Sequence, residues 1–235
     1  MIRINKFLAQ AGETSRRAAD EQIARGAVTI DGRIAKPGDR VDPTSSDVRV
    51  QGERLRPVPA THVTIALNKP LGMVTTMRDE RGRPCVGDLL KHSARSKNAL
   101  PRLFPVGRLD ARTTGLLLLT TAGELCRNLT HPSRGVERRY RVTVNASLSD
   151  DTIRALGATR IRQRADGAVQ FEMTLQRGQN REIRRACAQH GLRVVALERI
   201  AYGPIEVGNL RRGEFRYLTE REAESLARAA SVKAQ

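Results

Sequence analysis

The chain has 235 residues, enough for one large domain or for a small domain followed by a medium one. It carries 42 Lys and Arg residues against 25 Asp and Glu residues, a formal net charge of +17. This excess favours a polyanionic partner, nucleic acid before an anionic membrane, while 3% aromatic content without tryptophan argues against broad base-stacking platforms. Residues 1–60 hold 11 basic and 8 acidic residues, a net of +3, which leaves +14 for the rest. The downstream part is therefore expected to hold much of the polyanion itself.

The cysteines and the chain termini indicate the compartment. Cys85, Cys126 and Cys187 are odd in number and form no CxxC, which argues against a disulfide framework or a zinc site and fits a reducing cytoplasm. The N-terminus lacks the apolar core of a signal peptide, and no apolar run approaches the length of a membrane span. Without a Cys/His cluster, a phosphate-binding loop or a dinucleotide fingerprint, we expect no metal and no cofactor.

The N-terminal residues predict two short helices followed by a hairpin. Apolar residues at helical spacing indicate a helix over 3–12, and Thr14 or Ser15 can cap a second helix that ends near Arg25. An alternating segment then surrounds the Asp-Gly pair at 31–32, which is the strongest short signal for a hairpin turn.

These elements predict a compact domain over residues 1–56, and the proline-containing segment 57–62 predicts a linker. Basic side chains on the two helices either face phosphates or form an ordinary solvated surface, and the pattern alone leaves both interpretations open. They are Lys6, Arg16, Arg17 and Arg25.

Residues 63–235 predict strands interleaved with a few helices. Connections of the antiparallel type indicate an α+β domain, a mixed and mainly antiparallel sheet with flanking helices. The expected elements are a strand over 63–70, a short helix over 86–91 inside the loop 78–101, a helix over 120–130, strands over 138–144 and 168–175, helices over 149–157 and 178–191, one or two strands over 193–205, a closing strand near 215 and a final helix from Thr219 or Glu220.

The segment 104–121 contains the most informative carboxylate. Four leucines follow Gly115, and such an apolar run suits a strand that is buried on both faces. Asp110 is then expected in a loop that leads into this strand, between Arg108 and Arg112. It is a candidate nucleophile, a general base or one end of a structural ion pair, and in isolation the ion pair is the more ordinary interpretation.

Three further residues stand out, and the first two have two interpretations each. Lys69 either touches a phosphate or caps the loop that follows its strand. Tyr140 is by its alternation a core aromatic, although a tyrosine can bury its ring and still present its hydroxyl. Arg184 lies on a predicted helix without an acidic residue at helical spacing, which leaves it free to pair with a distant carboxylate.

Several motifs in one order carry a family resemblance. The sequence GRLD at 107–110 is followed by TTGLLLLTT at 113–121, and NKPLG at 68–72, HPSRGVERRYRV at 131–142 and GQNREIRRACAQHG at 178–191 accompany it. Together they resemble the RNA pseudouridine synthases of the RsuA/RluB/RluF branch. The first sixty residues resemble the small alpha-L RNA-binding domain of that branch, so the resemblance covers nearly the whole chain.

This resemblance implies the pseudouridine synthase fold and assigns roles to individual residues. Asp110 matches the catalytic carboxylate, and Arg184 matches the cation that keeps it ionised when RNA excludes water. Tyr140 matches the tyrosine that packs on the target base, and Arg108 matches the arginine that inserts where the uridine flips out. RNA contacts are implied for basic residues of both domains, namely Lys6, Arg16, Arg17, Arg25, Lys69, Arg181 and Arg185.

The motif at 131–142 resembles the RluB type more than the RsuA type. It implies site-specific isomerisation of uridine in large-subunit ribosomal RNA, by a cytoplasmic monomer acting on that RNA or on a ribosome assembly intermediate. Alternatives are the same chemistry on small-subunit ribosomal RNA or on transfer RNA, and a non-catalytic ribosome-associated RNA-binding protein. A methyltransferase would need a cofactor fingerprint, which the sequence lacks. Only the enzyme requires Asp110, Tyr140 and Arg184 to meet in one cleft.

Overall fold

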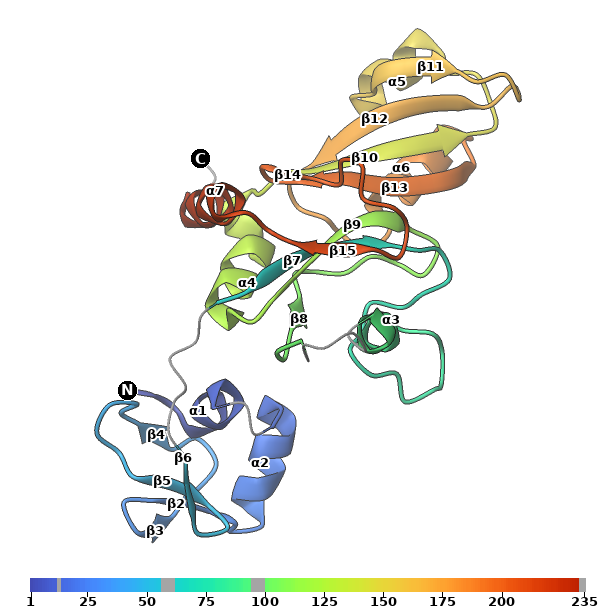
Figure 1. The fold of residues 1–235 in the computed structure, drawn as a ribbon. Helices are drawn as coiled ribbons and strands as arrows, with labels where there is room; N and C mark the ends of the chain where they lie inside the picture. The colour runs from blue at the N-terminus through green and yellow to red at the C-terminus, as the bar shows by residue number, and fades with distance from the viewer. Residues whose placement is uncertain (12–13, 56–61, 94–99, 233–235) are drawn as a thin grey trace. The chain divides into compact units, whose positions relative to one another are not determined.

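The computed structural model describes residues 1–11, 14–55, 62–93 and 100–232. The chain forms two compact units, Met1–Thr61 and His62–Gln235 (Figure 1). Apart from His62, the linker expected at 57–62 lies outside the described residues.

The first unit contains the two predicted helices and more strands than predicted. Ser15 caps the second helix, because its Oγ accepts a hydrogen bond from the backbone N–H of Ala18 at 3.0 Å. The hairpin between β2 and β3 turns at Asp31 and Gly32, where φ is +49° and +80°. A second hairpin, between β5 and β6, was not predicted. The elements are β1 (Ile2–Arg3), α1 (Ile4–Gln10), α2 (Arg16–Ala24), β2 (Val28–Ile30), β3 (Arg33–Ile34), β4 (Arg40–Val41), β5 (Val48–Val50) and β6 (Glu53–Leu55).

The second unit is built on one sheet in the order β11-β12-β10-β13-β9-β7-β15, with β14 paired to β13 and β8 to β9. Within the described residues, β9 and β13 form the parallel pair and the other neighbours are antiparallel, which confirms the predicted α+β class. The elements are β7 (Thr64–Lys69), α3 (Val86–Ser93), β8 (Phe104–Pro105), β9 (Thr114–Thr120), α4 (Gly123–Thr130), the short 3₁₀ helix η1 (Pro132–Arg134), β10 (Arg138–Val144), α5 (Asp150–Leu156), β11 (Thr159–Gln163), β12 (Val169–Leu175), α6 (Glu182–Gln189), β13 (Val194–Tyr202), β14 (Ile205–Glu206), β15 (Phe215–Tyr217) and α7 (Glu220–Ser231).

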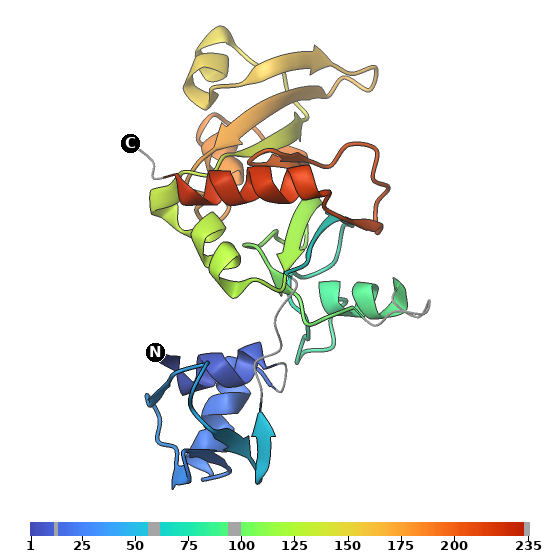
Figure 2. The ribbon, with the colours of Figure 1, turned by 60° about the vertical axis from the view of Figure 1, so that its left-hand side comes forward.

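Strand β9 is buried on both faces, as its four leucines predict. Leu117 and Leu119 belong to the core that also contains Tyr140, whereas Leu116 and Leu118 belong to the core beneath α4 and α7. Figure 2 shows these two helices side by side on one face of the sheet. The strand is therefore a fixed element from which the preceding loop extends.

Two sequence predictions need correction. The helix expected over 178–191 begins only at Glu182, because Arg181 has φ +49° and the carboxylate of Glu182 accepts a hydrogen bond from the N–H of Gln179 at 2.7 Å. Strand β11 was missed because its five residues are all exposed at the edge of the sheet, so no alternation of apolar and polar residues marks it.

Gly115 allows the close approach of the paired strands β9 and β13. Its φ is +98°, and an added Cβ would lie 2.3 Å from the backbone oxygen of Arg199. We expect Gly115→Ala to lower the free energy of unfolding by about 3 kcal/mol or more, because backbone atoms on both strands would have to move. Gly123→Ala is the matched control, since nothing lies within 4 Å of its Cβ position and φ is not positive. Urea unfolding of both variants tests this, and a Gly115→Ala protein as stable as the control would contradict it.

The N-terminus of the last helix, α7, is stabilised by an ion pair. Thr219 and Glu222 form a capping box, and both guanidinium Nη atoms of Arg216 donate to the Glu222 carboxylate at 2.7 Å. The Arg216 hydrogen bonds hold the pKa of Glu222 at about 2, below its ordinary value of 4.5. This contribution is therefore fully present above pH 4.5 and is lost as the pH falls toward 2.

We expect Glu222→Gln to lower the free energy of unfolding by about 1–2 kcal/mol at neutral pH. The difference from wild type should shrink between pH 4.5 and pH 2. Glu224→Gln is the control, because its ion pair with Arg228 is long, at 3.8 Å, and exposed. Unfolding curves at several pH values measure the difference, and one that grows in acid would contradict the assignment.

Candidate active site

A pocket of about 270 Å³ lies where the loop before β9 meets β10 and the turn before α6. Five of the residues singled out from the sequence line it, which brings together segments that are far apart along the chain. They are Arg108, Asp110, Tyr140, Arg181 and Arg184. Leu197 of β13 and the turn residues Gln179 and Asn180 complete much of the wall.

The loop that carries Asp110 is held through its backbone. The hydroxyl of Thr75 donates to the carbonyl oxygen of Leu109 at 2.7 Å and accepts from the Leu109 N–H at 3.1 Å. The N–H of Gly72 donates to the carbonyl oxygen of Ala111 at 2.8 Å. The segment after β7 therefore braces one side of this loop.

The remaining two carbonyls of the loop are also occupied. The N–H of Thr113 donates to the carbonyl oxygen of Asp110 at 3.0 Å, and Nη2 of Arg184 donates to that of Arg112 at 2.8 Å. Every carbonyl from Leu109 to Arg112 thus accepts a hydrogen bond. The backbone of the loop is set without any contribution from the Asp110 side chain.

The carboxylate of Asp110 is exposed and open to a ligand. Across the described ranges, its side chain makes no hydrogen bond and no ion pair within 4.0 Å. The structural ion pair considered from the sequence is therefore not formed with any described residue. A carboxylate on a rigid loop, with its oxygens unoccupied, is suited to act on a group that enters the pocket.

Arg184 braces the pocket instead of pairing directly with Asp110. Besides its bond to Arg112, its Nη1 donates to the carbonyl oxygen of Val194 at 3.2 Å, so the guanidinium joins α6 to β13 and to the loop. Burial and the neighbouring charge of Arg181 lower the pKa of Arg184, while the charge of Asp110 acts in the opposite direction. The two groups thus interact through space.

Of the two interpretations of Lys69, the structure supports the loop cap. Its side chain is fully buried, and Nζ donates to the carbonyl oxygens of Pro70 at 2.9 Å and Met73 at 2.7 Å. Burial lowers its pKa to about 8, against the opposing influence of Asp110. The ammonium caps the loop after β7 and does not reach the surface, so the phosphate contact expected from the sequence does not fit this position.

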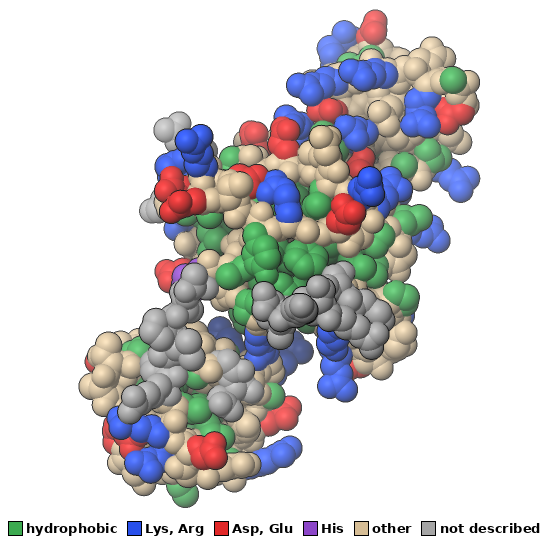
Figure 3. Space-filling view, viewed as in Figure 1, with side chains coloured by type: hydrophobic (Ala, Val, Ile, Leu, Met, Phe, Trp, Pro, Cys, Tyr) green, Lys and Arg blue, Asp and Glu red, His purple; other side chains and the backbone are tan. Residues whose placement is uncertain are grey.

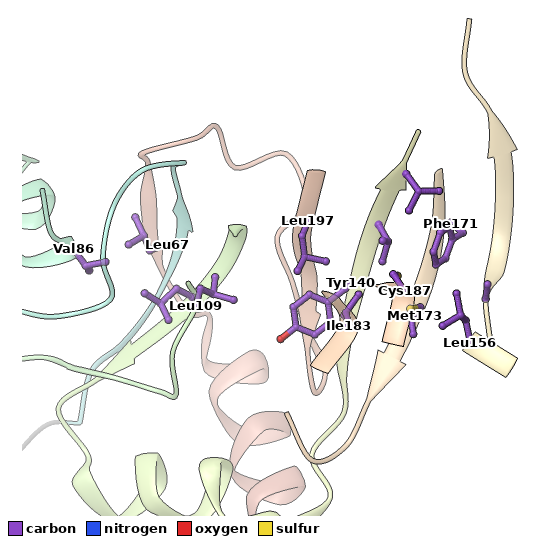
Figure 4. Close-up of a cluster of buried hydrophobic side chains, with 14 of the residues drawn as sticks. Leu67, Val86, Leu109, Tyr140, Leu156, Phe171, Met173, Ile183, Cys187 and Leu197 are labelled. Carbon is purple, nitrogen blue, oxygen red and sulfur yellow. The ribbon is translucent and has the colours of Figure 1, made fainter. Parts of the chain in front are cut away.

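Tyr140 combines a buried ring with a place in the pocket wall. The residue is 8% exposed and belongs to the larger core. Figure 4 shows its ring near Ile183, Cys187 and Met173, with the hydroxyl oxygen on the side where Leu109 lies. An aromatic ring at this depth offers a face or edge to a planar group next to the carboxylate.

The other predicted basic residues are exposed or half-buried and lie outside the pocket wall. Lys6 lies on α1, Arg16 and Arg17 begin α2, and Arg25 follows its end. Arg185 on α6 is exposed and donates to the side-chain oxygen of Gln179 at 3.3 Å.

Sequence reasoning missed Thr75 and the turn at 178–181. The hydroxyl of Thr75 acts on a residue 34 positions away, and no local pattern marks such a contact. The turn was missed because the residues after it have helical spacing, which was extended back to Gly178. The glycine itself, which has φ +64° in the structure, is a sequence signal against a helix at this position.

Among the described residues there is no group of three or more His, Cys, Asp or Glu side chains placed to hold a metal ion. No helix within those ranges has the length and apolarity needed to cross a membrane.

Comparison with known proteins gives the same picture from sequence and from fold. The family model for RNA pseudouridylate synthase matches residues 63–189, and the S4 domain model matches residues 2–47. An uncharacterized RNA pseudouridine synthase of Mycobacterium tuberculosis (strain H37Rv) is 40% identical over 98% of this chain and 95% of its own length. The dual-specificity RNA pseudouridine synthase RluF of Escherichia coli K12 is 35% identical, over 94% of this chain and 77% of its own.

A crystal structure of a pseudouridylate synthase superposes with a TM-score of 0.61 and 27% identity, covering 96% of this chain and all of that one. With a shared fold and nearly full-length relatives, the larger unit is an RNA-modifying isomerase joined to an RNA-binding S4 domain. The chain belongs to the RNA pseudouridine synthase family, in its RsuA/RluB/RluF branch.

Proposed function

We propose that this enzyme isomerises a specific uridine of ribosomal RNA, that this RNA is the large-subunit one, and that Asp110 is the catalytic carboxylate. The observation that carries the proposal is the convergence of Asp110, Tyr140 and Arg184 on one pocket. A non-catalytic RNA-binding protein requires only surface Lys and Arg and has no need of this arrangement.

The reaction breaks the bond between C1′ of the ribose and N1 of the uracil, turns the base and joins C1′ to C5. C5 loses its proton and N1 gains one, so the product is an isomer of uridine. Asp110 supports it because its oxygens are unoccupied and its backbone is fixed. Tyr140 packs against the base that enters the pocket, and Arg108, exposed at the rim, occupies the gap that the flipped nucleotide leaves. The charge of Asp110 acts on both Arg184 and Lys69, so these two cations belong to the electrostatic environment of the carboxylate.

Affinity comes from phosphate contacts that position the RNA without reading its sequence. We assign these contacts to basic residues next to the pocket and on the S4 domain, which are the exposed Arg181, Arg185, Arg16, Arg17 and Arg25 and the half-buried Lys6. In Figure 3, basic and acidic side chains are interspersed over the visible face of the larger unit, so no single basic patch on that face marks the RNA path.

Mapping of pseudouridine tests the proposal. Transcripts of both ribosomal RNAs, transfer RNA and partly assembled particles are treated with the enzyme, and the modified positions are read out. One new site in large-subunit RNA is the expected result. A site only in small-subunit or transfer RNA would overturn the substrate assignment and keep the chemistry. We further infer a cytoplasmic monomer, and sedimentation of the protein alone tests its oligomeric state.

A further inference from the structure

Arg138, the first residue of β10, is a buried arginine that the proposed mechanism does not use. The residue is 7% exposed. Across the described ranges, no carboxylate oxygen lies within 4.0 Å of its guanidinium. A buried charge without a counter-ion costs free energy, and an apolar side chain would fill the position without that cost. The role of Arg138 is therefore sought in the groups to which its nitrogen atoms donate.

The guanidinium of Arg138 joins three segments of the chain. Its Nη1 donates to the carbonyl oxygen of Gln176, just after the end of β12, at 2.7 Å. Its Nη2 donates to the hydroxyl of Tyr202 on β13 at 3.0 Å and to the carbonyl oxygen of Leu129 on α4 at 3.3 Å. The planar fork of an arginine can hold acceptors in several directions at once, which the single ammonium of a lysine does less well.

Tyr202 belongs to the same cluster but does not reach the segment after β12. Its hydroxyl donates to the carbonyl oxygen of Leu129 at 2.7 Å, and its ring lies 5.0 Å from the guanidinium carbon of Arg138. Within the part of the chain that the structure describes, Tyr202 makes no hydrogen bond to Gln176. The contact with Gln176 is thus made by Arg138 and not by the tyrosine.

The hydrogen bond to Gln176 lies at the base of the active-site turn, here defined as residues 176–181. Pairing of β12 with β10 ends one residue before Gln176. Gly178 then packs over the guanidinium, because a Cβ atom at this glycine would lie 3.4 Å from Nη1 of Arg138 and 3.6 Å from its Cζ. The last four residues of the turn line the candidate active-site pocket. The guanidinium therefore supports the turn where it leaves the sheet.

The position of the turn matters for the proposed reaction. The turn forms part of the pocket wall and carries Arg181, to which a phosphate contact is assigned. A displaced turn would move this wall relative to Asp110. Misplacement of a reacting group by about 1 Å can lower a rate by roughly 10²-fold.

We propose that Arg138 is a positioning residue for the isomerisation of uridine. Its guanidinium holds the active-site turn in the place where the turn completes the pocket. Arg138 touches no substrate in this role and acts through the turn alone. The inference rests on the proposed function, but the contact on which it depends can be measured without activity.

Arg138→Met and Tyr202→Phe give a matched comparison. Arg138→Met removes every hydrogen bond of the guanidinium and releases Gln176, whereas Tyr202→Phe removes two hydrogen bonds of the cluster and leaves the one to Gln176. We expect both substitutions to lower the melting temperature. At a temperature where both variants are folded, only Arg138→Met should lower the single-turnover rate at saturating RNA, by roughly tenfold or more.

Backbone amide signals give a readout that does not depend on catalysis. In the ¹⁵N-labelled full-length protein, the N–H signals of the active-site turn should shift or broaden in Arg138→Met. They should keep their wild-type positions in Tyr202→Phe, because that variant retains the bond to Gln176.

Two further variants complete the design. Arg141→Met removes another guanidinium of β10, one that pairs with Glu198, and should leave both the turn signals and the rate unchanged. If Arg138→Met does not fold, Arg138→Lys takes its place with the same expected results, since lysine keeps the charge but lacks the fork.

The proposal is overturned if the turn signals are unchanged in the folded Arg138 variant, or if that variant turns over like wild type at saturating RNA. An equal loss of rate in Tyr202→Phe also overturns it, because the rate would then follow the stability of the cluster. A wild-type protein that makes no pseudouridine contradicts the proposed function instead, and the amide signals still decide whether Arg138 holds the turn.

Discussion

Asp110→Asn is expected to abolish pseudouridine formation while leaving the protein folded and able to bind RNA. Among the described residues the carboxylate makes no hydrogen bond or ion pair, and the loop is held through its backbone, so the isosteric amide disturbs no contact. Losing a catalytic carboxylate should lower the turnover number by roughly 10⁴-fold or more. RNA affinity should stay within a few-fold, because no phosphate contact is removed.

Single-turnover assays on the RNA identified by mapping measure the rate, and filter binding measures affinity. Asp150→Asn is the matched control, since it neutralises an exposed carboxylate at the start of α5, away from the pocket. It should turn over like wild type. Turnover retained in Asp110→Asn would remove Asp110 from the mechanism, and a large loss of affinity would reassign it to RNA binding.

Arg184→Ala is expected to have the next largest effect on activity. The substitution leaves the carbonyls of Arg112 and Val194 without their donor and removes a positive charge that acts on Asp110. A loosened loop and the loss of a positive charge that interacts with Asp110 should together lower turnover by roughly 10²-fold or more. Single-turnover rates measure this, and thermal unfolding measures how much of the effect is structural.

Arg184→Lys separates the two contributions. Lysine keeps the charge but lacks the planar fork that reaches two carbonyls, so a low rate in both variants assigns the role to bracing. A rate close to wild type in Arg184→Lys assigns it to charge. Arg154→Ala, which removes an exposed arginine on α5, is the control and should be active. Wild-type turnover in Arg184→Ala would exclude both roles.

Local patterns in the sequence predicted much of the fold. Four leucines after Gly115 indicated a strand buried on both faces, and their side chains are fully buried. Ser149 and Thr219 cap helices that begin within one residue of the expected positions, because a side-chain oxygen that accepts from the first turn is a local signal. The candidate site residues came from motifs, and Asp110, Tyr140 and Arg184 line one pocket.

The contacts that shape the site could not be predicted, because their partners are distant in sequence. Arg184 donates to the carbonyl of a residue 72 positions away. Every residue has a backbone carbonyl, so the sequence does not indicate which one will accept the hydrogen bond. The depth of Lys69 was equally hidden, because its strand position allows either face until the sheet and the loop after it are assembled. The late start of α6 depends on the left-handed conformation of Arg181, which arginine rarely adopts.

The fully bonded loop around Asp110 also bears on the thermodynamics of substrate binding. Its four carbonyls are occupied in the free protein, so the conformational entropy of ordering this loop is lost during folding and not during association with RNA. The heat-capacity change on binding should then contain no contribution from folding this segment. It should reflect the surface that protein and RNA bury and the unstacking of the nucleotide that leaves the helix.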